Sequence, residues 1–217
     1  MLDLHVGGVG FGKTAILGEI NLSVVRSETL ALVGPSGVGK TTLLRIIAGL
    51  ENLHDGHCTV SGRVAMVFQE PTLLPWRTLS ENLCIATGIT QADALTALAE
   101  VGLAGRAEDY PNALSLGQQR RLSLARAFAA KPGLLLMDEP FVSLDSHLVE
   151  EMMVLFAKLR AAHKVTTILV THVEEEAKRL ASRIVTLGGT PGQITSDVQN
   201  RGAYFQLSAS GVTSSNS

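Results

Sequence analysis

Two stretches of the chain match the pattern G-x-x-x-x-G-K-[ST], in which a loop surrounds the oxygens of a phosphate group. They are GGVGFGKT at 7–14 and GPSGVGKT at 34–41. In such a loop the backbone N–H groups converge on the phosphate, and the next helix directs its N-terminus at it. This geometry requires a strand before the loop and a helix after it. The flanking segments therefore decide which stretch can bind phosphate.

The segments around 34–41 have the required patterns. TLALV at 29–33 is typical of a buried strand, and TLLRIIAGL at 42–50 has apolar residues at the spacing of one helix face, from Leu43 to Leu50. Gly49 favours a helix end there. We predict that Lys40 reaches the β- and γ-phosphates of a nucleotide and that the Thr41 hydroxyl binds Mg²⁺. The predicted ATP-binding residues of this loop are Gly34, Pro35, Ser36, Gly37, Val38, Gly39, Lys40, Thr41 and Thr42.

The segment after 7–14 has a different pattern. In AILGEINLSVV at 15–25, apolar residues largely alternate with small or polar ones, which favours a strand. Gly18 would weaken a helix by about 1 kcal/mol relative to Ala. With strands on both sides, 7–14 is predicted to be a hairpin-like turn, and Lys13 is not predicted to bind phosphate.

An acidic pair ends the apolar run LLLMDEP at 134–140. Asp138, at the end of a predicted strand, can hold Mg²⁺ through water, and Glu139 can polarise the water that attacks a γ-phosphate. An acidic pair after a strand can also be a solvated sheet edge. The phosphate loop upstream favours the catalytic interpretation.

Two further polar residues end apolar runs. Gln69 closes VAMVFQ at 64–69 and could bridge Mg²⁺ and the attacking water, or it could be a turn residue. His172 ends TTILVTH at 166–172, a strand pattern whose C-terminal edge places an imidazole within reach of a γ-phosphate; a lone histidine can also be structural.

The segment NALSLGQQRRLSLARAFAAKP at 112–132 predicts a helix preceded by Ser115 and Gly117, with Arg120 and Arg121 early in it. The helix N-terminus forms a second anion-binding surface. One nucleotide needs a single such surface, so this one is predicted to serve ATP held by another subunit.

These motifs, in this order over about residues 2–190, resemble those of the nucleotide-binding subunit of an ATP-binding cassette (ABC) transporter: GPSGVGKT, VFQ, LSLGQ, LLLMDEP, SLD at 143–145 and VTH. The resemblance implies an α/β P-loop NTPase fold with a mainly parallel core sheet, an N-terminal antiparallel β subdomain and a helical subdomain at about 70–130. The catalytic residues would be Glu139, His172 and Gln69. ATP and Mg²⁺ would be the cofactors, with Thr41, Gln69 and Asp138 around the metal.

The resemblance further implies two such subunits arranged head to tail, with two ATP molecules at the interface. A homodimer is expected, and a heterodimer is the alternative. Ser115, Leu116, Gly117 and Gln118 would contact the ATP held by the partner, and Asp145 would cross the interface. An aromatic residue about nine positions before the strand I-N-L stacks on adenine in the family. Here INL is 20–22, so this residue is Phe11; the alternative is an ordinary apolar turn residue.

Four features depart from the family pattern. Leu116 replaces a glycine of the usual LSGGQ, which would weaken or retune closure of the dimer if that position needs positive φ or close approach of the backbone to the phosphate. Val142 removes a hydroxyl, Val173 replaces an aspartate, and the segment from Lys40 to Gln69 is short. None of these changes affects the predicted catalytic residues.

EPTLLPWRTLSENL at 70–83 lies where the family receives its membrane subunit, and it resembles importers of the nitrate, sulfonate and taurine group, with thiamine-precursor importers close. Trp76 is either an exposed docking residue or part of the helical core. The implied partners are an integral membrane permease and a solute-binding protein. Two alternatives remain: a soluble ABC ATPase without coupling to transport, and a non-catalytic nucleotide-binding module, which Glu139 and His172 disfavour.

Composition narrows the class of protein. The net charge of −2 and the absence of a basic run give nucleic-acid binding little support. Cys58 and Cys84 have no partner at metal-ligand spacing and are expected to be reduced thiols. No run of about 18 apolar residues occurs, and the N-terminus lacks a secretory pattern. We expect an ABC ATPase domain at 1–207, a flexible tail at 208–217, and a cytoplasmic location, peripheral on the inner face of the cell membrane.

Overall fold

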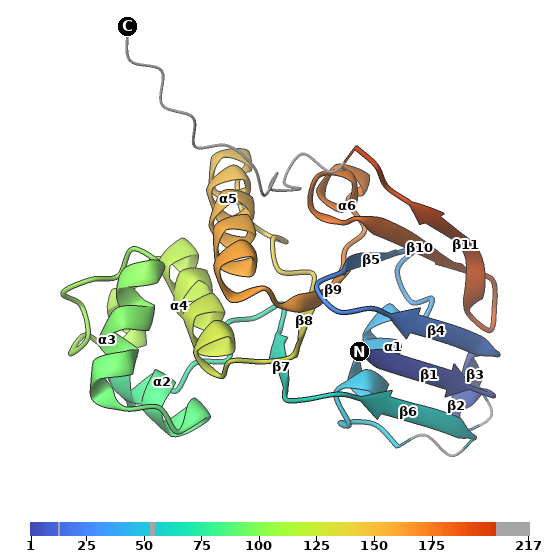
Figure 1. Ribbon diagram of the computed structural model, residues 1–217, viewed down its shortest axis with the longest axis horizontal. Helices are drawn as coiled ribbons and strands as arrows, with labels where there is room; N and C mark the ends of the chain where they lie inside the picture. Colours follow the sequence, from blue (N-terminus) through green and yellow to red (C-terminus); the bar gives the residue numbers. More distant parts are fainter. Residues whose placement is uncertain (13, 53–54, 203–217) are drawn as a thin grey trace, which may run out of the picture.

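The computed structural model describes residues 1–12, 14–52 and 55–202, with the side chain of Phe11 also outside the description. Its centre is a six-stranded sheet in the order β11-β10-β5-β9-β8-β7 (Figure 1). Five of these strands are parallel, and the edge strand β11 is antiparallel to β10. The predicted mixed, mainly parallel sheet is confirmed. The strands are β5 (Thr29–Val33), β7 (Val64–Val67), β8 (Leu134–Asp138), β9 (Thr166–Val170), β10 (Arg183–Gly188) and β11 (Gln193–Gln199).

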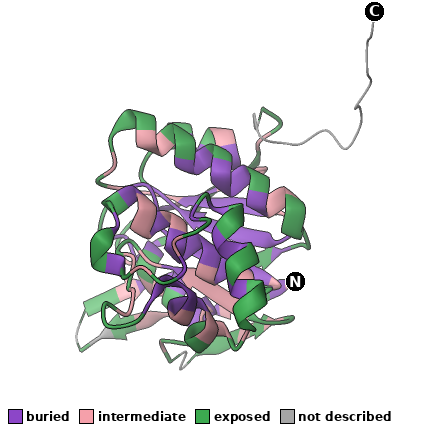
Figure 2. Ribbon diagram, turned by 90° about the vertical axis from the view of Figure 1, so that its left-hand side faces the viewer, coloured by how far each residue is buried: buried purple, intermediate pink, exposed green. Residues whose placement is uncertain are grey.

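The central strands are apolar throughout because both faces of the sheet are covered. On β8, Leu135 and Met137 belong to one hydrophobic core with helices α4 (Leu116–Ala129) and α5 (Ser146–His163). Leu134 and Leu136 belong to a second core with helix α1 (Lys40–Ile47). Figure 2 shows the buried residues gathered at the centre and the exposed ones on the outer faces of the helices. This two-sided burial fixes the carboxyl ends of the strands, where the polar residues follow.

Six α-helices lie within the described residues. α2, α3 and α4 lie together at one end of the molecule, away from the antiparallel strands (Figure 1), and all three fall inside the predicted helical range 70–130. On α5, Met152, Leu155 and Leu159 lie on one face and are buried, and Leu148 on the same face is half-buried. The helices are α1 (Lys40–Ile47), α2 (Leu79–Thr87), α3 (Gln91–Glu100), α4 (Leu116–Ala129), α5 (Ser146–His163) and α6 (Glu174–Leu180), with a 3₁₀ turn at Pro111–Ala113.

The N-terminal region is antiparallel, as predicted. One sheet has the order β4-β1-β6, and a separate hairpin pairs β2 with β3. The predicted hairpin is confirmed, but 7–14 is not only a turn, because it contains β2 and the first residue of β3; Lys13 lies outside the described residues. The strands are β1 (Leu2–Val6), β2 (Val9–Phe11), β3 (Thr14–Leu17), β4 (Ile20–Val24) and β6 (Gly56–Val60).

The predicted helix after the loop and its end at Gly49 are confirmed, but the bounds 42–50 are shifted by two or three residues. α1 begins at Lys40, and it ends at Ile47 because Gly49 takes a positive φ of 70°. Leu50, predicted on the apolar face, is 60% exposed as a result. Among the described residues, no helix has the length and hydropathy needed to cross a membrane. The predicted tail at 208–217 lies outside the described residues.

Candidate functional site

The loop 34–41 lies between β5 and α1, as the phosphate-binding geometry requires. All three of its glycines have positive φ, and Gly37, at 79°, has open space for a Cβ. The other two are Gly34 at 150°, where a Cβ would lie 2.4 Å from the Leu187 carbonyl oxygen, and Gly39 at 107°. Both positions therefore require glycine. Gly39 also caps α1 without a side chain, which leaves the first N–H groups of the helix open toward the loop.

Lys40 is only 5% exposed, and its ammonium group is enclosed by the loop itself. The Nζ atom donates to the carbonyl oxygens of Gly34 (2.8 Å) and Pro35 (2.9 Å). Burial lowers the pKa of Lys40, and the nearby carboxylates of Glu139 and Asp138 oppose that shift. The structure thus places a positive charge within the curve of the loop.

A cavity of about 260 Å³ lies against this loop. It combines the N-terminus of α1 with an ammonium, two hydroxyl-bearing threonines and one carboxylate, which is a donor-rich surface for a phosphate chain. Ile16 of β3 also lines it, so the β2–β3 hairpin borders the loop. The lining residues are Ile16, Ser36, Gly37, Gly39, Lys40, Thr41, Thr42 and Glu139.

Asp138 and Thr41 meet beside the cavity. The Thr41 hydroxyl donates to Asp138 Oδ1 at 3.1 Å, and Asp138 is 8% exposed. Burial raises the pKa of Asp138, and the hydrogen bond from Thr41 opposes the shift. A hydroxyl and a carboxylate in contact form the hard oxygen donor set that Mg²⁺ prefers. These residues therefore fit the predicted cation.

Glu139 takes a different direction from Asp138 because the strand turns at its end. Its φ is 46°, a left-handed value that is uncommon outside glycine, and its N–H donates to the Val170 carbonyl at 3.0 Å. The turn lets both neighbouring carboxylates face the same edge of the sheet. His172 Nδ1 lies 3.3 Å from Glu139 Oε1, so the edge joins an acid and an imidazole.

Gln69 lies two residues beyond β7 and is exposed. Its carbonyl oxygen accepts a hydrogen bond from Arg120 Nη1. Gln69, like Asp138, is not among the residues that line the 260 Å³ cavity.

The predicted contacts to a partner's ATP lie at a second helix start. Ser115 caps α4 in a reciprocal pair: its hydroxyl accepts from Gln118 N (3.3 Å), and Gln118 Oε1 accepts from Ser115 N (3.1 Å). The pattern S-x-x-Q is a sequence signature of this capping box that the sequence analysis missed. Asp145 likewise caps α5 by accepting from Leu148 N at 2.9 Å.

Leu116 causes no backbone strain within the subunit. It is the first residue of α4, has negative φ, and is 44% exposed. The more closely packed position is Gly117, where a Cβ would lie 2.7 Å from the Leu148 side chain on α5, so that this side chain would have to shift. The two capped helix starts therefore touch each other, and Leu116 projects outward from that contact.

Arg120 is a residue whose place the sequence did not reveal. It is 5% exposed rather than facing an anion, and its guanidinium donates to the carbonyls of Gln69 and Val142. Arg121 bonds to Glu151 on α5 at 2.7 Å. Periodicity alone gives no signal for such contacts, because the partners lie 51 and 22 positions away in the chain.

The fold and this site define a P-loop nucleoside triphosphatase of the α/β class. The family model described as "ABC transporter" matches residues 17–142, more than half of the chain. The "aliphatic sulfonates import ATP-binding protein SsuB 2" of Pseudomonas syringae pv. tomato is 40% identical over 200 residues, covering 91% of this chain and 86% of that protein. The corresponding SsuB protein of Granulibacter bethesdensis is 44% identical over 189 residues, covering 86% and 79%.

Among solved structures, a dimeric post-hydrolysis state of the ATP-binding cassette MJ0796 bound to ADP and Pi is similar with a TM-score of 0.80 and 29% identity. The match covers 93% of this chain and 100% of that one. The chain belongs to the ABC transporter family. It is an ABC ATPase, as the motifs predicted.

Proposed function

We propose that the chain is the ATP-binding and ATP-hydrolysing subunit of an importer for small sulfonates, acting on a separate membrane permease. The hydrolytic part rests chiefly on one observation: Thr41, Asp138, Glu139 and His172 meet at a single sheet edge beside the loop 34–41. The sulfonate part rests on the relatives, which are named as aliphatic sulfonate import proteins.

In this proposal Lys40 and the N-terminus of α1 hold the phosphates, and Phe11 stacks on adenine. Thr41 and Asp138, with Gln69, would hold Mg²⁺, which when bound supplies positive charge to the phosphate oxygens. Glu139 polarises the water that attacks the γ-phosphorus, so that the bond to the bridging oxygen breaks and ADP leaves. His172 orients Glu139 and contacts the γ-phosphate.

The second half of each ATP site comes from another copy of the chain. The solved cassette MJ0796 is described as dimeric. Ser115, Leu116, Gly117, Gln118 and Asp145 would face the partner's ATP in a head-to-tail homodimer. The reciprocal cap of Ser115 and Gln118 already satisfies two N–H groups at the start of α4, so the partner's phosphate would be met by the groups that the cap leaves unused.

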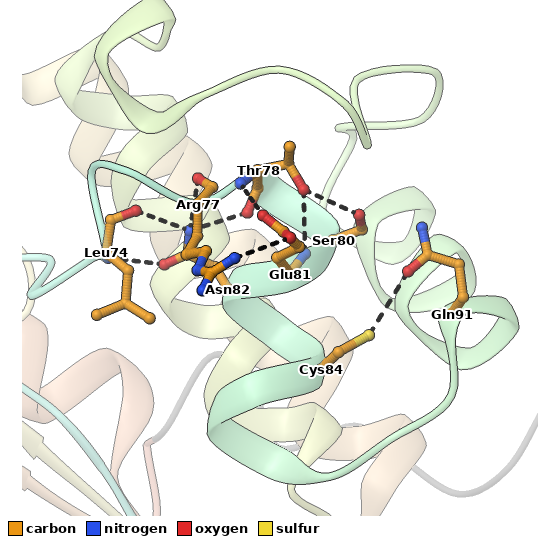
Figure 3. A network of polar contacts seen from close by, with 8 residues as sticks. All are labelled: Leu74, Arg77, Thr78, Ser80, Glu81, Asn82, Cys84 and Gln91. Atoms are coloured by element: carbon orange, nitrogen blue, oxygen red, sulfur yellow. Dashed lines mark hydrogen bonds and ion pairs between the residues drawn. The ribbon is translucent and has the colours of Figure 1, made fainter.

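The permease would dock at the segment after Gln69, where Trp76 is 68% exposed. Figure 3 shows why this segment keeps its shape: Asn82, fully buried, bonds to three residues of it. Asn82 Oδ1 accepts from Leu74 N (2.8 Å), and its Nδ2 donates to the carbonyls of Leu74 (3.1 Å), Arg77 (3.1 Å) and Thr78 (2.9 Å). A large exposed aromatic on an ordered loop is typical of a binding surface, which favours a membrane partner over a free soluble ATPase.

The assembly we propose is cytoplasmic and peripheral on the inner face of the membrane, with a solute-binding protein delivering the sulfonate. The chain would comprise one ABC ATPase domain at 1–207, with the helical subdomain at about 70–130 and a flexible tail at 208–217. Nucleic acid has no part in this function.

Purification of the tagged chain from solubilised membranes tests whether the ATPase is coupled to a membrane permease. Recovery of a polytopic partner whose vesicles take up an alkanesulfonate with ATP supports the proposal, and recovery of ribosomes or DNA contradicts it. Uptake of nitrate in place of sulfonate would contradict only the substrate. A measurement of the molecular size of Glu139→Gln with ATP tests the dimer. A strict monomer under these conditions would contradict ATP-dependent closure of two subunits around the nucleotide.

A further inference from the structure

Helix α4 holds the segment that follows β7 through three side chains on successive turns. Arg120 Nη1 donates to the Gln69 carbonyl, and Ser123 Oγ donates to the Pro71 carbonyl at 2.8 Å. Arg126 donates to the Thr72 carbonyl (2.8 Å), the Thr72 hydroxyl (2.9 Å) and the Pro71 carbonyl (3.2 Å). The segment is thus attached to α4 by its backbone, without a strand or helix of its own.

Arg120 also reaches a third part of the molecule. Its Nη2 donates to the Val142 carbonyl at 3.2 Å, and the N–H of Val142 donates to the Glu139 carbonyl at 3.3 Å. One guanidinium therefore joins α4 to the segment after Gln69 and to the turn that carries Glu139.

The environment of Arg120 is unfavourable for stability alone. It is 5% exposed, its guanidinium donates to the carbonyls of Gln69 and Val142, and its Nε has no hydrogen-bond partner among the described residues. Burial lowers its pKa, with the Glu70 carboxylate opposing the shift. A buried cation that is bonded only to carbonyl oxygens loses its hydration, and no ion pair compensates for that loss. A role beyond packing accounts for an arginine at this position.

We propose that Arg120 is a positioning residue that makes α4, the segment after Gln69 and the turn after Glu139 move as one unit. Ser123 and Arg126 extend that unit along residues 70–78, the stretch that carries Trp76 and is called the Trp76 loop below. The inference rests on the proposed function, in which α4 faces the partner's ATP and the Trp76 loop faces the permease. Movement at the docking loop would then reach both the catalytic turn and the second half of the ATP site. Binding of ATP to the loop 34–41 does not require Arg120, which does not line that cavity.

Three variants of the full-length chain test this. Arg120→Met removes every donor at similar length, Arg120→Lys keeps the charge without the two-pronged geometry, and Arg121→Met is the matched control, since Arg121 bonds to Glu151 instead. The readouts are kcat, KM for ATP and the fluorescence anisotropy of Trp76, the only tryptophan of the chain.

For Arg120→Met we expect kcat to fall by roughly tenfold or more, KM to stay within about twofold, and the Trp76 anisotropy to drop. Arg120→Lys should recover part of kcat, and Arg121→Met should stay near wild type in all three. A folded Arg120→Met with wild-type kcat and anisotropy overturns the proposal, as does an equal loss in Arg121→Met.

If Arg120→Met does not fold, Ser123→Ala and Arg126→Met replace it and should lower the Trp76 anisotropy; an unchanged anisotropy in both contradicts the proposal. These readouts need no permease. A wild-type chain that hydrolyses ATP but binds no membrane partner would therefore contradict the proposed transport function alone.

Discussion

Residues 34–41 and residues 7–14 share one sequence pattern but take different paths in the fold. The first connects β5 to α1, and the second crosses the hairpin of β2 and β3. Only the first is followed by a helix whose N-terminus opens toward it, and only a helix supplies aligned N–H groups for a phosphate. Whether such a loop can bind phosphate is therefore determined by the element that follows it, and not by the sequence of the loop alone.

The two stretches are nevertheless neighbours in space. Ile16 of β3 lines the cavity at the phosphate loop, and a Cβ at Gly39 would lie 2.4 Å from the side chain of Leu17. The hairpin therefore packs against the loop and borders the same site. In our account the two strings serve two ends of one ATP molecule: phosphates at 34–41 and adenine at Phe11.

The largest effect on stability should separate two glycines at the same position of the pattern. At Gly39, alanine meets both a φ of 107° and the Leu17 side chain, whereas at Gly12 it meets a φ of 62° with open space. We expect Gly39→Ala to cost about 2–4 kcal/mol of unfolding free energy and Gly12→Ala about 1 kcal/mol. Urea unfolding measures the unfolding free energy of both variants. Equal losses of stability would contradict the difference proposed between the two loops.

A smaller effect is expected at Phe11, on the hairpin. Loss of stacking on adenine in Phe11→Ala should weaken ATP binding by roughly tenfold, about 1.4 kcal/mol, with kcat nearly unchanged. Titration with a fluorescent nucleotide provides the affinity, and Phe11→Trp serves as the control that retains a stacking surface. An unchanged affinity for ATP in Phe11→Ala would mean that Phe11 is an ordinary apolar turn residue and does not stack on adenine.

The smallest change in stability concerns the buried charge beside the phosphate loop. Because the folded pKa of Asp138 is raised, ionisation opposes folding: this penalty is absent below the unfolded pKa and fully present above the folded one. Asp138→Asn keeps an acceptor for Thr41 and should raise the urea midpoint at pH 7. The gain should disappear as the pH falls through the folded pKa, while ATP hydrolysis at pH 7 is lost. A lower midpoint at pH 7 contradicts this.

Much of the site could be predicted because it depends on local patterns. Apolar runs marked β5, β8 and β9, and their ends marked Asp138 and His172. Leu50 was placed wrongly because periodicity continued past the glycine that ends α1. Trp76 stayed undecided, since exposure follows from packing and not from residue type.

Arg120 could not be predicted for a related reason. Two arginines, Arg120 and Arg121, are adjacent in the predicted helix, and the sequence does not show which of them is buried. Only the fold reveals this, because it brings the distant carbonyls of Gln69 and Val142 to Arg120. The capping box of Ser115 and Gln118, by contrast, was visible in the sequence as S-x-x-Q and was overlooked in favour of a ligand role.

The comparison between the two stretches is tested most directly by one pair of variants. ATP turnover at saturating ATP is measured for Lys40→Ala and Lys13→Ala side by side. Our account predicts that Lys40→Ala falls to roughly a hundredth of wild type or below, and that Lys13→Ala stays within about twofold. Turnover that survives in Lys40→Ala, or is lost in Lys13→Ala, would contradict the assignment of the phosphates to residues 34–41.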